Sequence, residues 1–218
     1  MLMLHVVLVS KNKSIYVKTL HSILGIEAMC NHAGLQLDIT FVNDDSVDKM
    51  DLLKKKLKSA DRIFWVEYGV SVDKDSLMNS VIKYDNHDGL VFPVVKEGID
   101  WDMFKQKCKD NSNEPAEQCG LTFDTTVSSK VINKDRNLYE VTKTQPSCWV
   151  LDCKRVMKKL VDKGKKKDIV FPATVGQFFD KCIDKNVKLA AAVNSVTYNH
   201  FTHECVGNIM NIPGIKVT

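Results

Sequence analysis

The sequence lacks the features that define several common protein classes. None of its seven cysteines forms a Cys-x-x-Cys pair, and their odd number and scattered positions argue against a disulfide framework or a zinc ribbon. We therefore expect reduced cysteines and a cytoplasmic location. No run of eighteen apolar residues occurs, which argues against a transmembrane helix. The apolar stretch 1–9 is short and soon followed by lysine, so it does not predict a signal peptide.

The common nucleotide-binding loops are also missing. The chain contains no Gly-x-Gly-x-x-Gly and no Walker sequence, so the usual dinucleotide and NTP cradles are excluded. The net charge of +4 is too small to indicate nucleic acid. Eight basic residues gather between 154 and 167, but no aromatic residue lies among them. We interpret this cluster as a solvated helix face, with an anionic membrane or nucleic acid as the alternative, and we expect no nucleic-acid partner.

Apolar strands alternate with amphipathic helices along most of the 218 residues. This alternation predicts an α/β fold with a mixed, mostly parallel central sheet and helices on both faces. Pro93 lies inside one predicted strand, which suggests an edge position or a bulge. A polar segment, 105–120, predicts an irregular excursion over the active face. The predicted strands are 4–10, 37–42, 62–66 with a short extension at 70–72, 89–95 and 187–193, with two further candidates at 138–141 and 148–151; the predicted helices are 14–34, 48–59, 75–86, 154–161 and 174–185.

The most informative segment is 39–48, where an apolar run ends in polar residues. Asn43, Asp44 and Asp45 follow the predicted strand directly, and a lysine-rich helix comes next. Ligands of open α/β sheets lie just outside the carboxyl ends of the strands. The segment therefore predicts a ligand beside one of these aspartates. The other aspartate is expected to cap the helix, since carboxylates are favoured at helix N-termini.

Five segments, taken in order, resemble GT-A-type glycosyltransferases. They are 6–13 with 20–24, 43–48, 63–77, 147–156 and 196–200. The chain is similar to small glycosyltransferases of large algal (chlorella) DNA viruses in its lysine-, asparagine- and aspartate-rich composition. The resemblance implies a GT-A-like (Rossmann-like) domain over 1–218, with a nucleotide-binding half, 1–95, and an acceptor-side half, 96–218. It leaves open whether this domain is cut from a longer chain.

The resemblance also implies roles for particular residues. Glu67-Tyr68-Gly69 aligns with the Asp-x-Asp sequence of the family, so Glu67 and His200 would bind Mn²⁺ or Mg²⁺. A literal Asp-x-Asp occurs at Asp73 and Asp75, but its position before Ser76 and Leu77 is more typical of a helix start. His203 is a weaker alternative metal ligand. The alternative for His200 is a structural histidine in a loop. The nucleotide would contact Ser10, Asn12, Asp44 and Asp45, with Asp44 accepting from uracil N3–H.

For sugar and acceptor, the candidates are Tyr68, Trp101 and Trp149, because sugars stack on aromatic faces. Trp149 has core packing as its simpler explanation, since it lies within an apolar run. Asp100 and Asp102 flank Trp101 in a predicted loop and are the candidate catalytic carboxylates. The acidic motif that the family carries near the start of its penultimate helix is absent, because 172–175 reads Pro-Ala-Thr-Val.

Three functions follow as hypotheses. The first is a metal-assisted glycosyltransferase that moves a sugar from a UDP-sugar to a glycan or glycoprotein acceptor, with glycosylation of viral capsid proteins in the host cytoplasm as one setting. The second is a non-catalytic sugar- or partner-binding module, because only Glu67 remains of the Asp-x-Asp pair. The third is a sugar-phosphate nucleotidyltransferase, although the glycine-rich basic signature of that class is missing after the first strand.

Overall fold

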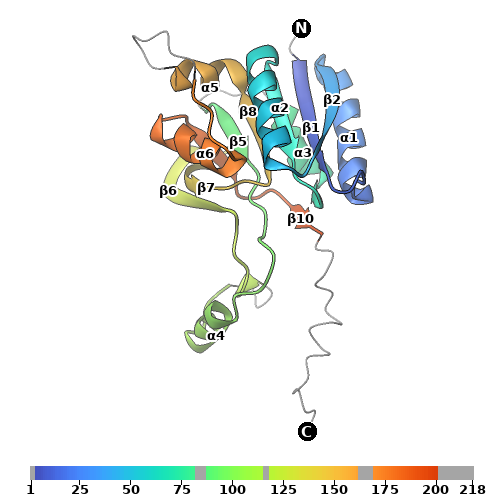
Figure 1. Ribbon diagram of the computed structural model, residues 1–218. Coiled ribbons are helices and arrows are strands. Elements are labelled where there is room, and N and C mark those ends of the chain that lie inside the picture. Colours follow the sequence, from blue (N-terminus) through green and yellow to red (C-terminus); the bar gives the residue numbers. More distant parts are fainter. Residues whose placement is uncertain (1–2, 82–86, 115–117, 162–168, 201–218) are drawn as a thin grey trace.

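A computed structural model describes residues 3–81, 87–114, 118–161 and 169–200, and its centre is an eight-stranded sheet (Figure 1). The strand order is β2-β1-β3-β8-β5-β9-β7-β6. Strands β2, β3 and β1 are parallel, as are β5 and β9, whereas β8 runs against both its neighbours and β7 runs against β9. The strands are β1 (Met3–Ser10), β2 (Gln36–Asn43), β3 (Arg62–Val66), β5 (Gly89–Val91), β6 (Thr125–Asn133), β7 (Leu138–Thr144), β8 (Cys148–Asp152) and β9 (Leu189–Ala192).

Helices cover both faces of this sheet. Helices α1 (Val17–Ala33) and α3 (Lys74–Val81) lie on one face, and α2 (Ser46–Ser59), α5 (Cys153–Leu160) and α6 (Val175–Asp184) lie on the other (Figure 1). The alternation of β1 shows why: Val6 and Leu8 pack into one buried cluster with Ile23 of α1, while Val7 and Val9 pack into the second. Successive side chains of a strand point to opposite faces, so a wholly apolar strand requires a helix layer on each side. The predicted α/β class is confirmed.

Two tryptophans form the floor beneath the carboxyl end of β3. Trp65 and Trp149 are fully buried cross-strand partners whose rings stack at 5.3 Å between centroids, and Phe179 of α6 meets Trp149 edge-on. Large aromatic side chains that bury this fully contribute much of a core's stability. The same stack fixes the position of the residues that follow Trp65 in the chain.

A separate two-stranded sheet lies at the carboxyl edge of the main sheet. It pairs β4 (Val70–Val72) with β10 (Thr197–Asn199) in antiparallel fashion. The predicted extension at 70–72 is therefore a strand, but it belongs to this second sheet. Its partner comes from the end of the described chain, so the fold brings the segment after β3 next to residues 125 to 129 positions later.

Three local predictions are wrong. Helix α1 begins at Val17 after Tyr16, because Ser14 instead donates its hydroxyl to the Lys11 carbonyl in the turn after β1. Strand β5 is interior, between β8 and β9, and Pro93 simply follows its end, so the edge position expected from this proline does not occur. A regular helix, α4 (Trp101–Lys109), forms in a segment expected to be irregular from 105 onward.

The sequence pattern predicts neither helix α4 nor strand β6, and the reason is the same for both. Both are poor in buried residues, so neither has the apolar periodicity on which such predictions depend. Helix α4 lies at the tip of a long excursion that projects away from the sheet (Figure 1). None of the helices that the structure describes is both long and apolar enough to cross a membrane.

Candidate functional site

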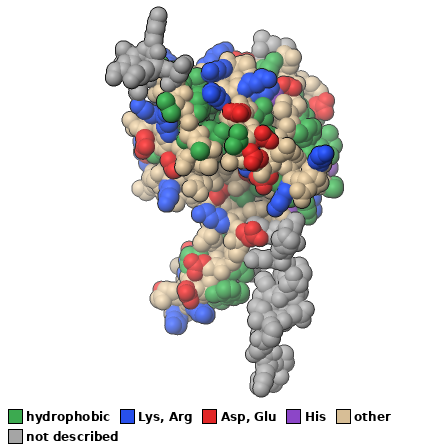
Figure 2. All heavy atoms as spheres, in the orientation of Figure 1, with side chains coloured by type: hydrophobic (Ala, Val, Ile, Leu, Met, Phe, Trp, Pro, Cys, Tyr) green, Lys and Arg blue, Asp and Glu red, His purple; other side chains and the backbone are tan. Residues whose placement is uncertain are grey.

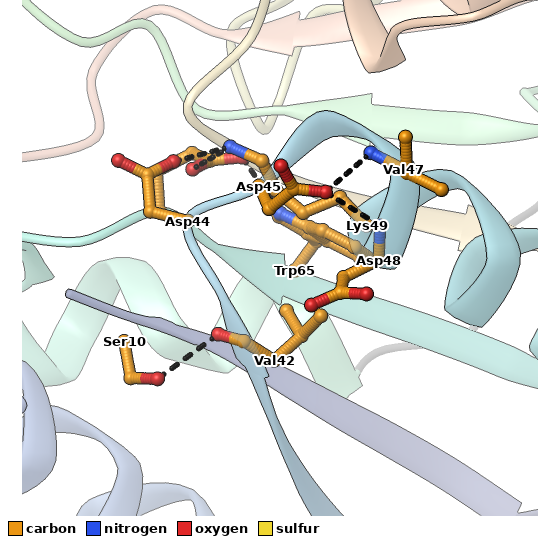
Figure 3. Close-up of polar contacts among 9 residues, drawn as sticks. Ser10, Val42, Asp44, Asp45, Val47, Asp48, Lys49 and Trp65 are labelled. Carbon is orange, nitrogen blue, oxygen red and sulfur yellow. Dashed lines mark hydrogen bonds and ion pairs between the residues drawn. The ribbon is translucent and has the colours of Figure 1, made fainter. Parts of the chain in front are cut away.

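The polar residues after β1, β2 and β3 meet at one edge of the sheet. Ser10 is the register partner of Asn43, and the Asp44 amide donates to the Ser10 carbonyl at 2.8 Å. Asp45 accepts hydrogen bonds from the amides of Val47 and Asp48, at 2.8 and 3.1 Å, and so caps α2 (Figure 3). Asp45 is thus the helix cap of the pair, which leaves the Asp44 side chain for other contacts.

Asp44 and a second carboxylate share the ammonium group of Lys49. The Lys49 Nζ atom lies 2.7 Å from Asp44 Oδ1 and 3.0 Å from Glu67 Oε2. Burial by itself lowers the pKa of Lys49, but the attraction and hydrogen bonds of the two carboxylates outweigh it and raise that pKa above its usual value. Lys49 is therefore a cation held between the ends of β2 and β3.

Glu67 is the best-anchored carboxylate at this edge. Its Oε1 atom accepts from Trp65 Nε1 at 2.9 Å, while its Oε2 atom faces Lys49. Burial raises the pKa of Glu67 above its usual value against the opposing attraction of Lys49. The carboxylate is held rigidly, because its tryptophan partner belongs to the buried stack beneath the site.

A cavity of about 500 Å³ opens beside this pair of charges. Its walls come from the first turns of α2 and α6, from Glu67 after β3 and from the segment 145–147 that precedes β8. The amide of Glu67 donates to the Ser147 carbonyl at 2.8 Å, so two walls are joined directly. Both helices present N-termini, which favour negative charge. The lining residues are Ser46, Lys49, Glu67, Gln145, Pro146, Ser147, Thr174, Val175 and Gly176.

Asp124 holds the 145–147 wall in place. This buried carboxylate accepts from the amide of Ser147 at 2.8 Å, from the amide of Val94 at 3.1 Å and from the Thr125 hydroxyl at 2.9 Å. Burial raises the pKa of Asp124, whereas these hydrogen bonds lower it. The residue joins the segment after β5 to the segment before β8 without lining the cavity itself.

The remaining predicted nucleotide and sugar residues differ in what they offer a ligand. Ser10 is buried and donates its hydroxyl to the Val42 carbonyl at 3.1 Å, whereas Asn12 is exposed in the turn after β1 with a positive φ of 52°. Tyr68 is partly buried and packs against the apolar cluster of Trp65. Trp149 has no exposed surface, so packing in the core replaces the sugar contact expected for it.

The structure does not bring Asp100, Trp101 or Asp102 to the cavity. Asp100 caps α4 by accepting from the Met103 amide at 2.8 Å, and the Asp102 side chain is 99% exposed. Trp101 is 47% exposed and touches Phe104 edge-on. Asp100 is the N-cap of α4, and Trp101 and Asp102 begin that helix. Helix α4 projects away from the sheet (Figure 1), and none of the three residues lines the cavity beside Glu67.

The second predicted metal ligand, His200, has other partners. Its Nε2 atom lies 2.9 Å from the Ser71 hydroxyl, and its ring stacks on Tyr16 at 4.3 Å. Burial lowers the pKa of His200, and Lys18 lowers it further. Its amide donates to the Gly69 carbonyl at 2.9 Å, so the chain places the histidine beside the Glu67-Tyr68-Gly69 segment without joining its ring to Glu67.

These residues do not fit a divalent cation. Both Glu67 oxygens already have partners, and Gly69, at the second position of the family sequence, has no side chain to offer. Across the described ranges, no three His, Cys, Asp or Glu side chains are grouped to hold a metal. Asp73 accepts from the Asp75 and Ser76 amides, so the literal Asp-x-Asp is a helix start. His203 lies outside the described residues.

The basic residues of α5 are largely paired, which matches their interpretation as a helix face. Lys154 lies 2.6 Å from Asp61, and Lys159 lies 2.6 Å from Asp88. Residues 162–168 of the predicted cluster lie outside the described part of the chain. In Figure 2 the basic and acidic side chains of the visible face are interspersed.

The sequence reading missed Lys49, Ser147 and Thr174. Lys49 lies four residues after the cap Asp45, in a helix whose many lysines resemble an ordinary solvated face. Asp45 and Lys49 are four residues apart and opposite in charge, a spacing that predicts an ion pair on a helix. In the structure Lys49 pairs with Asp44 instead. Ser147 and Thr174 reach the cavity from distant segments, so no local pattern marks them.

Comparison with known proteins identifies the fold. No protein-family model matches the sequence, and no curated protein matches it either. Among solved structures, A197 from STIV is 10% identical with a TM-score of 0.50, and the alignment covers 92% of this chain and 86% of that one. GalNAc-T7, solved with UDP, GalNAc and Mn²⁺, is 9% identical with a TM-score of 0.50; 92% of this chain aligns with only 44% of that chain. The likeness to the catalytic domain of Drosophila β1,4-galactosyltransferase 7 is weaker, with 9% identity, a TM-score of 0.46, and coverage of 94% and 76% of the two chains. At these identities the likeness shows the fold alone, and that fold is GT-A-like.

Proposed function

We propose that this protein is a glycosyltransferase that moves a sugar from a nucleotide donor, a UDP-sugar, to a hydroxyl of a glycan or glycoprotein. The observation that carries the proposal is the meeting of Asp44, Lys49 and Glu67 beside a cavity of about 500 Å³ at the carboxyl edge of the sheet. Ligands of open α/β sheets bind at this edge. The proposal includes one domain over 1–218, divided into a nucleotide-binding half, 1–95, and an acceptor-side half, 96–218.

The donor would lie across the ends of β1 and β2. The Asp44 side chain is 40% exposed, and within the described part of the chain Lys49 bonds only its Oδ1 atom, so Oδ2 can accept from the N3–H of uracil. Asn12 flanks the same edge from the turn after β1. A glycosyltransferase of this kind forms a bond from the acceptor oxygen to the anomeric carbon while the bond to the diphosphate breaks.

The proton of the acceptor hydroxyl needs a base. Glu67 is the carboxylate among the lining residues of the cavity, and burial raises its pKa, which makes it a stronger base than an exposed carboxylate. Asp100 and Asp102 stay predicted alternatives, supplied from α4. Among the described residues, no group of side chains provides the ligands that Mn²⁺ or Mg²⁺ requires.

Two alternatives are kept for the test to decide. The pairing of Glu67 with both Lys49 and Trp65 favours the non-catalytic binding module, because a carboxylate with two partners is less available for chemistry. A sugar-phosphate nucleotidyltransferase would use the same edge of the sheet. The viral source, the capsid acceptor and the cytoplasmic location stay predictions from the resemblance.

The test combines nucleotide binding with turnover. A ligand at about 100 times its Kd stabilises a fold by about 2.7 kcal/mol, so UDP, GDP and CMP can be compared by thermal shift. We expect stabilisation by UDP, its loss in Asp44→Ala, and release of UDP from a UDP-sugar. The matched control is Asp51→Ala, an exposed carboxylate on α2. Binding without turnover would favour the binding module, and pyrophosphate release from UTP and a sugar phosphate would favour the nucleotidyltransferase. Stabilisation by no nucleotide would refute the donor site.

A further inference from the structure

Where the GT-A resemblance implies a metal ion, this chain places a lysine. Glu67 aligns with the Asp-x-Asp sequence, and the group that its Oε2 atom meets is the Lys49 ammonium at 3.0 Å. Asp44, which follows β2, meets the same nitrogen at 2.7 Å. A cation site is expected to have carboxylates from two strand ends around one positive charge. Here that charge is the ammonium group of Lys49, a residue of α2 (Figure 3).

Gly69 occupies the second ligand position of the Asp-x-Asp sequence, and it has no side chain that could bind a metal. Gly69 has a φ of 77°, and a Cβ added there would lie 3.1 Å from the His200 carbonyl oxygen. A carboxylate at this position would strain the backbone and crowd the 69–200 contact that joins β4 to β10. The backbone geometry at Gly69 therefore disfavours an aspartate at the second position of the Asp-x-Asp sequence.

Lys49 retains capacity for a ligand. An ammonium group has three N–H donors, and Asp44 and Glu67 take two in the contacts that the structure records. Lys49 lines the cavity of about 500 Å³, and the lining also includes Thr174, the N-cap of α6, and the first residues of that helix. Hydrogen bonds in which the donor is ionised are roughly twice as strong as neutral ones, so a phosphate oxygen in this cavity would find its strongest partner in Lys49.

We propose that Lys49 replaces the divalent cation at this site, that it binds the diphosphate of the nucleotide donor directly, and that the protein binds its donor without a metal ion. The inference rests on the proposed function. In the transfer, the negative charge that develops on the leaving diphosphate as the anomeric C–O bond breaks is neutralised by the ammonium, with no proton transferred from it. Glu67 and Asp44 hold Lys49 in position.

The proposal makes opposite predictions from a metal site for two substitutions. Lys49→Met removes the cation, so UDP should bind roughly ten- to hundredfold more weakly in EDTA, the range expected for one charge-assisted hydrogen bond. Glu67→Gln removes a negative charge beside the diphosphate and keeps an acceptor, so UDP should bind equally well or more tightly. If Glu67 were a metal ligand, Glu67→Gln would instead abolish binding.

The experiment is titration calorimetry of UDP in EDTA and in MnCl₂, with uridine binding followed by ligand-observed NMR. Lys54→Met, an exposed lysine of α2, is the matched control, and Lys49→Arg tests whether charge alone is sufficient. If Lys49→Met does not fold, the double variant Lys49→Met/Glu67→Gln also removes the buried charge of Glu67, and the Asp44 carboxylate that remains is 40% exposed to solvent. UDP binding in EDTA that weakens with Lys49→Met while uridine binding is unchanged supports the inference.

Three results would overturn the inference, and they differ in what they leave standing. UDP binding that requires Mn²⁺ and is lost in Glu67→Gln would refute the lysine site and leave the glycosyltransferase proposal standing. Failure of both UDP and uridine to bind in either buffer would refute the donor site, and the inference with it. Equal UDP affinity for the Lys49→Met and Lys54→Met variants in EDTA would also refute the role of Lys49.

Discussion

Replacing Asp124 by alanine should destabilise the protein and loosen the 145–147 wall of the cavity, although Asp124 does not line the cavity itself. The carboxylate is 7% exposed and accepts from the backbone amides of Val94 and Ser147. Each buried amide that loses its partner costs about 1–3 kcal/mol. Burying the carboxylate has a cost of its own, which also raises its pKa, and the substitution removes that cost. This gain offsets part of the loss from the two amides. We therefore expect a loss of about 3 kcal/mol in the free energy of unfolding.

Thermal melting measures this loss. For a chain of this size, about 3 kcal/mol corresponds to a fall in Tm of roughly 6–12 °C. The control is Asp135→Ala, because Asp135 is an exposed carboxylate in the turn between β6 and β7. Since Ser147 lines the cavity and its carbonyl holds the Glu67 amide, Asp124→Ala should also weaken UDP binding. Equal melting temperatures for the two variants would refute the reasoning that Asp124 joins these segments.

Three further predictions concern the helix cap, the core and pH. Asp45→Ala removes the cap of α2 and should cost about 1 kcal/mol in chemical denaturation, whereas Asp51→Ala, exposed on the same helix, should cost little. Trp149→Ala should cost about 3–5 kcal/mol, while Trp101→Ala, which is half-exposed, should stay within about 0.5 kcal/mol; similar losses would contradict the assignment of only one to the core. Burial, with Lys56, lowers the pKa of His5, so its contribution to stability is present above pH 6.5 and is lost as pH falls through the lowered pKa. Melts from pH 7.5 to 5 should show this fall, and His5→Gln should reduce its slope; an unchanged slope would refute the assignment.

The class of fold was readable because its signal is local. Segments such as 62–66 and 174–185 carry the period of a strand or a helix in their own residues, and these elements formed close to the predicted bounds. The polar residues at 43–48 marked the carboxyl end of a strand for the same reason. Elements without buried residues, such as α4, were missed because exposure removes the apolar period.

Strand order and side-chain partners depend on contacts between distant segments. The antiparallel strand β8 lies between β3 and β5, which no local pattern specifies, and this insertion made β5 an interior strand despite Pro93. It also placed Trp149 against Trp65 in the core. A periodic pattern fixes which face of an element a residue occupies, but the element packed on that face is chosen by the whole chain.

The amino-acid sequence by itself determined that two aspartates stand at a strand end and that a glutamate follows the next parallel strand. Only the tertiary structure decided their roles. It made Asp45 the cap of α2, and it brought Lys49 between Asp44 and Glu67 at 2.7 and 3.0 Å. The physical reason is that capping depends on the backbone of neighbouring residues, whereas an ion pair between Lys49 and Glu67 requires α2 to pack on the sheet beside β3. The local sequence thus predicted the carboxylates at the strand ends, and the packing of α2 on the sheet brought Lys49 between them.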